Sequence, residues 1–368
     1  MSRKEYFVRS LEASIVKVTK GEAAYELFLR GALPDSLVAQ DASIIRTLAN
    51  NYTGPDGAAH ARKISAAEAA AYCLYYLPIN AYKAFTVLEA IGHHLSHSSD
   101  RFRVLDFGCG PGSASLALCE SYPEQLQIQA IDHSDSMLSL AQRIVAEYCK
   151  SRHGVSFEVA SRMRDIYDHK FDLIFASNVL CEMDKLVAQK TLDRFYQHLD
   201  QQGIIVMIEP ALVAPTRRLM HLRDILLHKF SDIVPVFPCT RCDNCPMRAQ
   251  SDTDWCHGTL GWEKSQLVSQ IDRLTGFNKH RLKYSALVVG RNAKMEAGYR
   301  VIQPAAKTRQ GVQALLCGAG FYGWASLPKK ERSPCNRPIE KAKSFDRLLI
   351  EKWQEPPTIS KTTQVTAS

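Results

Sequence analysis

Residues 103–210 alternate short apolar runs with longer amphipathic segments, and this alternation constrains the fold more than any other feature of the chain. Five runs are typical of strands: 103–108, 126–132, 155–160, 171–179 and 203–210. Segments with apolar residues at helical spacing follow three of them: 113–122, 136–149 and 186–199. Strands that alternate with helices form a parallel sheet covered on both faces. The sequence therefore predicts an α/β core.

A glycine-rich turn follows the first of these strands. Asp106 ends the strand, and Gly108, Gly110 and Gly112 come before the next helix. Glycines in such a turn let the backbone approach a ligand closely, because no Cβ lies in the way. The next strand ends in Asp132, where a carboxylate can accept hydrogen bonds from a ribose diol. The spacing differs from the Gly-x-Gly-x-x-Gly of a pyrophosphate site, and the acid that opens it suits a ligand with an amine.

These features resemble the class I S-adenosylmethionine-dependent methyltransferases over about residues 101–291. The resemblance implies a Rossmann-like sheet in which the glycine loop passes the amino-acid half of the cofactor and the acid of the second strand holds the ribose. We expect S-adenosylmethionine to contact six residues: Asp106, Gly108, Gly110, Gly112, Asp132 and Asn178.

The catalytic residues stay unassigned. The segment after the fourth strand reads ASNVLCEM and lacks the Asn/Asp-Pro-Pro-aromatic element of many amino-group methyltransferases. Cys181 is the thiol nearest to it, and no base is spaced to activate this thiol as a nucleophile. We interpret Cys181 as a small buried residue. Ser177, Asn178 and Glu182 are expected at the mouth of the cleft, where open α/β sheets bind ligands. A methyltransferase and a cofactor-binding protein without activity both fit this pattern.

A second feature is the density of thiols between Phe237 and Gly258, which hold four of the chain's 11 cysteines. Their spacing is CxxCxxCx10C, at Cys239, Cys242, Cys245 and Cys256. Thiolates two residues apart can turn inward onto one metal ion or cluster. A four-cysteine zinc site usually has two separated Cys-x-x-Cys pairs, so the overlapping pattern favours an iron-sulfur cluster and leaves zinc as the alternative.

The cysteine-rich stretch also takes part in a narrower resemblance, to the methyltransferase-like family of ribosomal small-subunit assembly proteins of mitochondria and some bacteria. The similar segments span about residues 60–320 and include ISAAEAAAYCLYYLP, EPALVAPTRRLMHLRDILL and FNKHRLKYSALVVGR. The resemblance implies metal ligands at Cys239, Cys245, Cys256 and, from a C-terminal β domain, Cys317. Cys242 is then an extra thiol and the alternative fourth ligand. The family usually has Gly-Thr after Glu-Pro, where this chain has Ala-Leu, so we expect the substrate side of the pocket to differ from that of the family.

The N-terminal residues have apolar positions at helical spacing and predict a helical region. Ser65 and Glu68 form a capping box, so a helix is expected to begin at Ala66. Pro78 is expected to bend or end this helix, because proline lacks the N–H of an inner turn and clashes with the turn before it. A second helix is expected over residues 81–95.

We divide the chain into four parts and expect two strands within residues 280–291. The parts are a helical region (1–97), the methyltransferase core (98–292) with its cysteine-rich metal-binding insertion (231–262), a small basic β domain (293–350) and a polar, disordered tail (351–368). The net charge of +8 lies wholly after residue 290, where 14 Lys/Arg stand against 6 Asp/Glu. Such a segment can lie against an anionic polymer, or it can be a solvated tail.

The remaining predictions concern location and partners. No run approaches the ~18 apolar residues of a membrane span, and the first 20 residues lack the apolar run of a secretory signal and contain two acids, unlike a transit peptide. We expect a monomer without a membrane partner in the bacterial cytoplasm, with the mitochondrial matrix as the alternative.

The family resemblance implies a factor that binds the small ribosomal subunit or its rRNA. Such a factor would carry S-adenosylmethionine and a 4Fe-4S cluster, and its methylation of rRNA stays open. The alternative is an ordinary S-adenosylmethionine-dependent methyltransferase of a small molecule or protein, with a structural zinc site.

Overall fold

The computed structural model describes residues 2–31, 33–53, 64–95, 101–122, 125–162, 170–318, 320–353 and 357–367. The chain forms two compact units. Unit 1 comprises Met1–Val206 and Gly261–Leu282, and unit 2 comprises Met207–Leu260 and Lys283–Ser368. The cysteine-rich segment therefore lies in the same unit as the C-terminal β domain, whereas the sequence assigned it to the methyltransferase core. The expected boundary between residues 97 and 98 lies outside the described residues.

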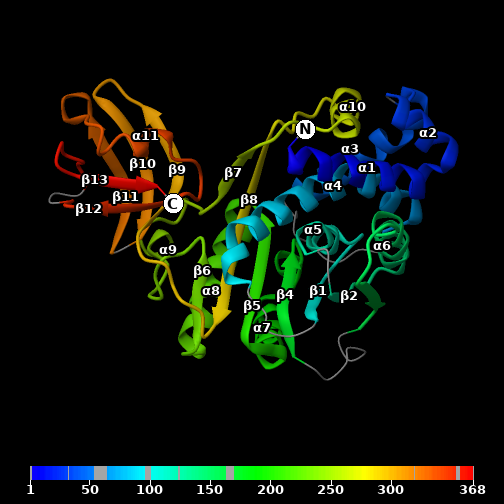
Figure 1. The fold of residues 1–368 in the computed structure, drawn as a ribbon, viewed down its shortest axis with the longest axis horizontal. Helices are drawn as coiled ribbons and strands as arrows, with labels where there is room; N and C mark the ends of the chain where they lie inside the picture. Colours follow the sequence, from blue (N-terminus) through cyan, green and yellow to red (C-terminus); the bar gives the residue numbers. More distant parts are fainter. Residues whose placement is uncertain are drawn as a thin grey trace. The chain divides into compact units, whose positions relative to one another are not determined.

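Strand β1 (Phe102–Phe107) is central to the parallel sheet of unit 1 (Figure 1). It pairs in parallel with β2 (Leu126–Ile131) and with β4 (Phe171–Ser177), and β2 pairs in parallel with β3 (Val155–Ala160). The strand order is β3-β2-β1-β4-β5, which confirms the predicted parallel sheet. The chain builds β2 and β3 on one side of β1 and then crosses to β4. The carboxyl ends of β1 and β4 therefore form the switch point at which such sheets bind ligands.

Helices of unit 1 follow the predicted alternation. Three connect the strands: α5 (Ser113–Ser121), α6 (Asp135–Tyr148) and α7 (Lys185–His198). A helical layer is formed by α1 (Arg3–Lys20), α2 (Glu22–Arg30), α3 (Ala39–Thr53), α4 (Ala66–Ile91) and α10 (Gln266–Thr275). Helix α4 contacts α5 and α6 of the core as well as α1, α3 and α10 (Figure 1). No helix in the described part of the chain is long and apolar enough to cross a membrane.

Helix α4 differs from the sequence prediction because it runs through Pro78 as one helix of 26 residues. It begins as predicted, with the capping box of Ser65 and Glu68. A proline inside a helix costs about 3 kcal/mol. Leu74, Leu77 and their neighbours are fully buried along this helix, and each such side chain contributes roughly 1.5–3 kcal/mol on burial. Tertiary packing therefore outweighs the local cost at Pro78.

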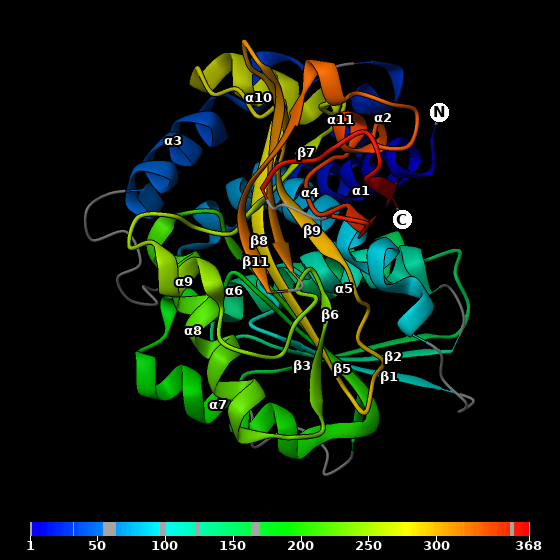
Figure 2. The same ribbon diagram turned by 90° about the vertical axis from the view of Figure 1, so that its left-hand side faces the viewer.

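Unit 2 begins with the end of β5 (Leu199–Pro210), followed by α8 (Val213–Lys229) and β6 (Ile233–Phe237), which contact each other (Figure 2). Strand β8 (Arg281–Arg291) lies between β5 and β6 and is antiparallel to β6. It is a single strand where the sequence predicts two. The buried hydroxyl of Ser285, in the middle of this strand, shares a 2.6 Å hydrogen bond with Thr216 and donates to the carbonyl of Cys256, so its polar group is satisfied inside the unit.

The C-terminal part of unit 2 is an antiparallel five-stranded sheet with the order β11-β10-β9-β12-β13. Its strands are β9 (Tyr299–Lys307), β10 (Gly311–Gly318), β11 (Phe321–Pro328), β12 (Arg347–Glu351) and β13 (Gln364–Ala367). One face covers a hydrophobic core that includes Val301, Leu316, Ala325 and Leu348. The predicted small β domain is confirmed.

The expected disorder of residues 351–368 is wrong for the described residues 357–367. Strand β13 pairs with β12 over four residues, and Ile359 and Val365 are buried in the core of the five-stranded sheet. The backbone of Ser326 brackets this segment, since its N–H donates to Pro357 and its carbonyl accepts from Ile359. The segment is polar overall, but its few apolar residues are enough to dock it as an edge strand.

This arrangement predicts that Ile359→Ala lowers the free energy of unfolding of the transition that includes unit 2 by about 2–5 kcal/mol. The side chain of Ile359 is 0% exposed, so its removal leaves a cavity. Thr362→Ala, at an exposed position of the same segment, should change stability by less than about 0.5 kcal/mol. Urea unfolding of the full chain measures both, and equal, negligible effects would contradict the docked tail.

Candidate functional site

The glycine loop of unit 1 lies at the predicted switch point, between the end of β1 and the start of α5. Gly108, Gly110 and Gly112 all have positive φ, at +66°, +53° and +88°. A Cβ on Gly108 would lie 2.4 Å from Val179, whereas a Cβ on Gly110 would meet nothing within 4 Å. The left-handed backbone explains why glycine is required. The open space beside Gly110 is where a ligand can approach the loop.

Asp132 organises this loop from the neighbouring strand end. Its Oδ2 accepts a hydrogen bond from the N–H of Gly110 (2.8 Å), and its Oδ1 accepts one from the N–H of Ser134 (2.9 Å). An ionised carboxylate has about four lone-pair sites. Two N–H donors therefore orient Asp132 and leave it able to accept hydrogen bonds from a diol. His133, exposed and 3.5 Å from Oδ1, is a further polar group here that the sequence reasoning missed.

Asp106 lies deeper than the sequence suggested. It is only 1% exposed, and its Oδ2 accepts hydrogen bonds from the N–H and the hydroxyl of Ser115 in the first turn of α5. Burial raises the pKa of this carboxyl to about 6. Through these two hydrogen bonds Asp106 anchors the start of α5 and the glycine loop that precedes it.

The end of β4 supplies the other wall of the switch point. Asn178 adopts a positive φ of +56°, which asparagine tolerates better than most residues, and its side-chain amide donates to the hydroxyl of Ser177 (3.2 Å). Partial desolvation and the nearby carboxylate of Asp132 raise the pKa of Glu182. Cys181 is buried. Glu182 is the one carboxylate of residues 176–183, and among the described residues we assign no general base.

In unit 2 the structure brings together four thiols from distant parts of the chain. Burial and the nearby Cys239, Cys317 and Cys245 raise the pKa of Cys256. Burial and the nearby Cys239 and Cys245 likewise raise the pKa of Cys317 to about 12. Cys242 is exposed, and its Sγ contacts the Sδ of Met295 at 3.7 Å instead. The group is thus Cys239, Cys245, Cys256 and Cys317.

The separation of these sulfur atoms bears on what they can hold. Among the described residues, no three of the cysteine sulfurs lie within 4.8 Å of one another. Four thiolates around one zinc ion, with Zn–S bonds of about 2.3 Å, would be about 3.8 Å apart. A cluster of several irons binds each thiolate to a different iron and therefore needs a wider set.

Two charged residues of α8 position the cysteine loop, and the sequence reasoning missed both. Arg223 is 1% exposed and donates to the carbonyls of Arg241 and Asp243 and to the carboxylate of Asp224. Burial lowers the pKa of Arg223, but Cys239 and Asp224 raise it by more. The available signal was an adjacent Arg-Asp pair on an otherwise apolar stripe of a predicted helix.

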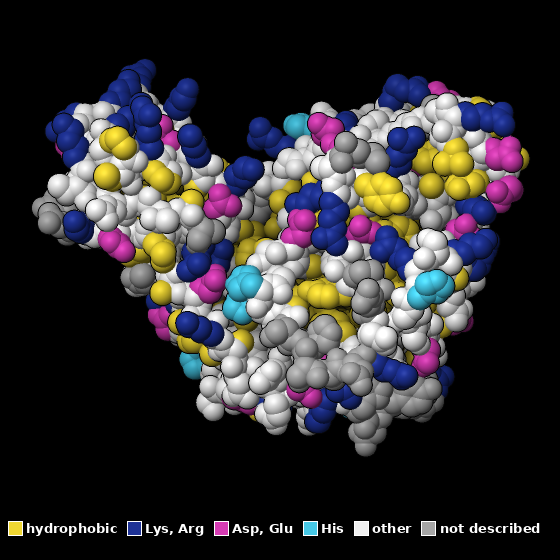
Figure 3. All heavy atoms as spheres, viewed as in Figure 1, with side chains coloured by type: hydrophobic (Ala, Val, Ile, Leu, Met, Phe, Trp, Pro, Cys, Tyr) yellow, Lys and Arg dark blue, Asp and Glu magenta, His cyan; other side chains and the backbone are white. Residues whose placement is uncertain are grey.

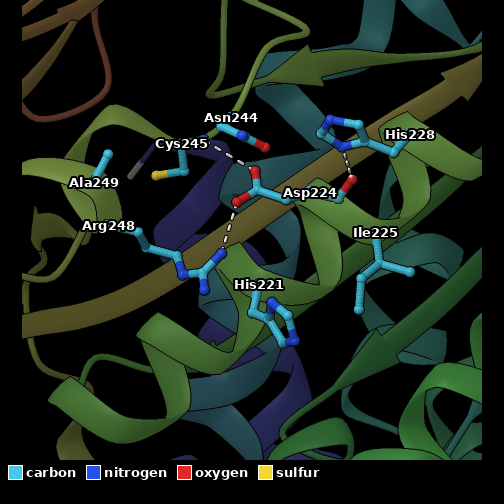
Figure 4. Close-up of a pocket in the computed structure, with 8 residues that line it drawn as sticks. All are labelled: His221, Asp224, Ile225, His228, Asn244, Cys245, Arg248 and Ala249. Carbon is cyan, nitrogen blue, oxygen red and sulfur yellow. Dashed lines mark hydrogen bonds and ion pairs between the residues drawn. The ribbon is translucent and has the colours of Figure 1, made fainter.

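Asp224 also fixes the backbone of Cys245, one of the metal-ligand candidates. It accepts hydrogen bonds from the N–H of Cys245 (3.0 Å) and from Arg248 (2.7 Å), as Figure 4 shows. A pocket of about 430 Å³ lies beside Asp224 and Arg248, and its wall includes His221 and His228. The loop that carries Cys245 is therefore fixed by hydrogen bonds that do not depend on a bound metal.

Contacts within unit 2 also tie β9 and β10 to the loop near Cys239. The hydroxyl of Thr240 donates to the carbonyl of Gly298 (2.9 Å), and Arg300 Nε donates to the carbonyl of Pro238 (2.7 Å). Gly318, next to Cys317, has a φ of +147°, and a Cβ there would lie 2.2 Å from the carbonyl oxygen of Gly298. Glycine at this position allows Cys317 to approach the loop.

The strand order and the glycine loop define a protein with the class I methyltransferase fold. The family model described as "Mitochondrial small ribosomal subunit Rsm22" matches residues 66–321. The chain belongs to this family, which confirms the resemblance seen in the sequence. The matched residues include every cofactor and metal-ligand candidate named above.

Solved structures give weaker likenesses. The plantazolicin methyltransferase BamL is 12% identical, with 70% of this chain and 99% of that chain covered and a TM-score of 0.41. Magnesium protoporphyrin IX methyltransferase from Synechocystis PCC 6803 is 13% identical over 71% and 99%, with a TM-score of 0.37. N-methyltransferase NodS from Bradyrhizobium japonicum WM9 is 15% identical over 59% and 89%, with a TM-score of 0.36. Among curated proteins no sequence match was found.

Proposed function

We propose that this protein binds the small ribosomal subunit or its rRNA during assembly, with S-adenosylmethionine in unit 1 and a 4Fe-4S cluster in unit 2. The observation that carries the proposal is the family match over residues 66–321, which spans a complete glycine loop and the four grouped thiols. The family description names the mitochondrial subunit. It supports the mitochondrial matrix, the alternative compartment of the sequence analysis, over the bacterial cytoplasm.

The pocket of unit 1 suits S-adenosylmethionine because its polar groups are already oriented. Asp132, fixed by the N–H groups of Gly110 and Ser134, can accept from the ribose hydroxyls. The open space at Gly110 admits the amino-acid half of the cofactor, and Asn178 lies at the opposite wall. When bound, S-adenosylmethionine supplies a methyl group on a positively charged sulfonium. The fit rests on the N–H groups of Gly110 and Ser134, which orient the carboxylate of Asp132.

A binding role is favoured over methyl transfer by the residues at the end of β4. Methylation of an amine or a base requires a group that accepts the departing proton or orients the acceptor. Cys181 is buried, and the amide of Asn178 already donates to Ser177. Glu182 can accept a proton, but nothing in the described residues aligns it with an acceptor. We therefore keep the catalytic residues unassigned.

The thiol group of unit 2 fits an iron-sulfur cluster better than zinc. Cys239, Cys245 and Cys256 come from the loop and Cys317 from β10, and their sulfurs are more widely spaced than a single ion requires. The guanidinium of Arg223 lies beside Cys239 and would offset part of the negative charge of the thiolates. A bound cluster would add the binding energy of four ligands to the folding of unit 2.

We predict that Asp132→Ala weakens the binding of S-adenosylmethionine by roughly 100-fold or more, because two charge-assisted hydrogen bonds of about 1.5–3 kcal/mol each are lost. Isothermal titration of the purified chain measures the affinity. Glu158→Ala, an exposed acid on β3, is the matched control and should leave the affinity unchanged. An Asp132→Ala variant that stays folded and binds normally would contradict the proposed ribose contact.

We predict that Cys317→Ser lowers the iron and sulfide content of anaerobically purified protein to below about half, whereas Cys242→Ser retains it, because the structure groups Cys317 and not Cys242 with the other thiols. Metal and sulfide analysis with an absorbance spectrum checks this. The reverse order of the two variants would assign the fourth ligand to Cys242. Full occupancy by zinc alone would overturn the cluster.

The ribosomal role predicts binding to isolated small subunits that weakens steeply with salt. If about four phosphates are neutralised, the affinity should fall roughly 50-fold between about 50 and 200 mM salt. Cosedimentation over a salt series measures this, and labelled S-adenosylmethionine in the same samples reports methyl transfer to rRNA. Tight cofactor binding without association with small subunits would instead favour a methyltransferase of a small molecule or protein.

A further inference from the structure

The five-stranded sheet has a second face, opposite its hydrophobic core. The register places Cys317 opposite Tyr322 and Leu315 opposite Trp324 on β10 and β11. Successive residues of a strand point to opposite faces. Leu316 and Ala325 belong to the core, so Cys317, Leu315, Tyr322 and Trp324 share the other face. This face, which we call the outer face, begins at the thiol group.

Trp324 is the distinctive residue of the outer face. Its side chain is 44% exposed, and it is the one tryptophan among the exposed large hydrophobic residues of the described chain. Tyr299, Phe321 and Trp353 on the same sheet pack edge to face with one another. Within the described residues no ring contacts Trp324. A large ring in an otherwise polar position is a surface on which another flat group can stack.

A group of cations lies at the rim of the sheet, at the end away from Cys317. Lys307 and Arg309 flank the turn from β9 to β10, and Lys329 and Lys330 follow β11. The N–H of Lys329 donates to the carbonyl of Gln310 (2.9 Å), so the two segments lie side by side. All four side chains are exposed, and none forms an ion pair with an acid of the described chain. Figure 3 shows Lys and Arg gathered over this end of the sheet.

The geometry sets the length of a ligand that could reach both features. Trp324 precedes Pro328 by four residues, which at about 3.3 Å per residue is ~13 Å along the strand. A few nucleotides of an extended strand cover this distance. The opposite end of the face is bounded by the cysteine loop, because the hydroxyl of Tyr322 donates to Asp254 (3.4 Å) and α9 (Pro246–Gln250) contacts β11. The ligand therefore runs from Trp324 toward the cations.

We propose that the outer face binds an unpaired RNA segment, with a base stacked on Trp324 and phosphates on Lys307, Arg309, Lys329 and Lys330. The proposal rests on the proposed role in small-subunit binding and names the surface and the kind of RNA. Bases in a duplex are stacked on one another, so only an unpaired base can stack on a protein ring. An acidic protein is the alternative partner for the cations, and competition by polyglutamate tests it.

The test uses the full chain and a fluorescein-labelled single-stranded RNA of roughly 12 nucleotides, within the range that a sheet of this size binds. Trp324→Ala should weaken binding about tenfold without changing the salt dependence, since stacking contributes little charge. Trp324→Phe should retain most of the affinity. Tyr6→Ala, at a comparably exposed aromatic residue on α1 (52% against 44% for Trp324), is the matched control and should have no effect.

Replacement of Lys307, Arg309, Lys329 and Lys330 by Gln should reduce the slope of log affinity against log salt by about 3, since each phosphate contact on single strands contributes about 0.7. The control removes four exposed cations of unit 1 in the same way: Arg9, Lys150, Lys185 and Lys190. An equal reduction in the control variant would overturn the assignment to the outer face.

Two outcomes separate this proposal from the proposed function. If Trp324→Ala and the four-Gln variant bind RNA and small subunits like the wild type, the outer face is not the RNA site and the ribosomal role stands. If the wild type binds neither single-stranded RNA nor small subunits, both proposals fail. A duplex of the same sequence, or polyglutamate, that competes as well as the single strand would also overturn the stacking.

Discussion

A buried guanidinium fixes the geometry on which the thiol group depends. Arg223 is enclosed in unit 2 and must satisfy its donors there, because an unpaired buried charge costs about 3–5 kcal/mol. It does so with the carbonyls of Arg241 and Asp243 and with Asp224. The two carbonyls lie on either side of Cys242 in the chain, so the bonds that satisfy one side chain also shape the loop. The thiols of Cys239 and Cys245 are placed as a consequence.

The pocket in unit 1 is also shaped by the hydrogen bonds of a charged side chain, in this case a carboxylate. A carboxylate in each unit accepts a backbone N–H of the loop beside it: Asp132 from Gly110, and Asp224 from Cys245. Charge-assisted hydrogen bonds of this kind are about twice as strong as neutral ones. Both loops are therefore ordered before a ligand binds, and binding need not supply the entropy of ordering them. Preorganisation is what allows glycine-rich and cysteine-rich segments to form defined sites.

Sequence reasoning predicted the strands of the core better than the features that depend on distant packing. The strands of the core follow apolar runs, which burial on both faces enforces, and β3 spans the predicted residues 155–160. Cys317 was placed by resemblance, not by spacing, because no local pattern links it to a loop 61 residues away. The continuity of α4 through Pro78 and the docking of Ile359 depend on partners remote in sequence. The helix or strand propensity of a segment does not include the packing energy that these distant partners supply.

The charge of the C-terminal region is a second property for which the sequence alone is incomplete, and the structure supplies the missing distinction. The sequence places the whole excess of +8 after residue 290 but does not separate structural cations from available ones. Arg300 is buried and donates to the carbonyls of Pro238 and Phe345, and Arg347 pairs with Glu296. These cations hold the sheet together. Of the exposed cations that remain, Lys307, Arg309, Lys329 and Lys330 lie together where the β9–β10 turn meets the end of β11, so this part of the excess can act on one anionic partner.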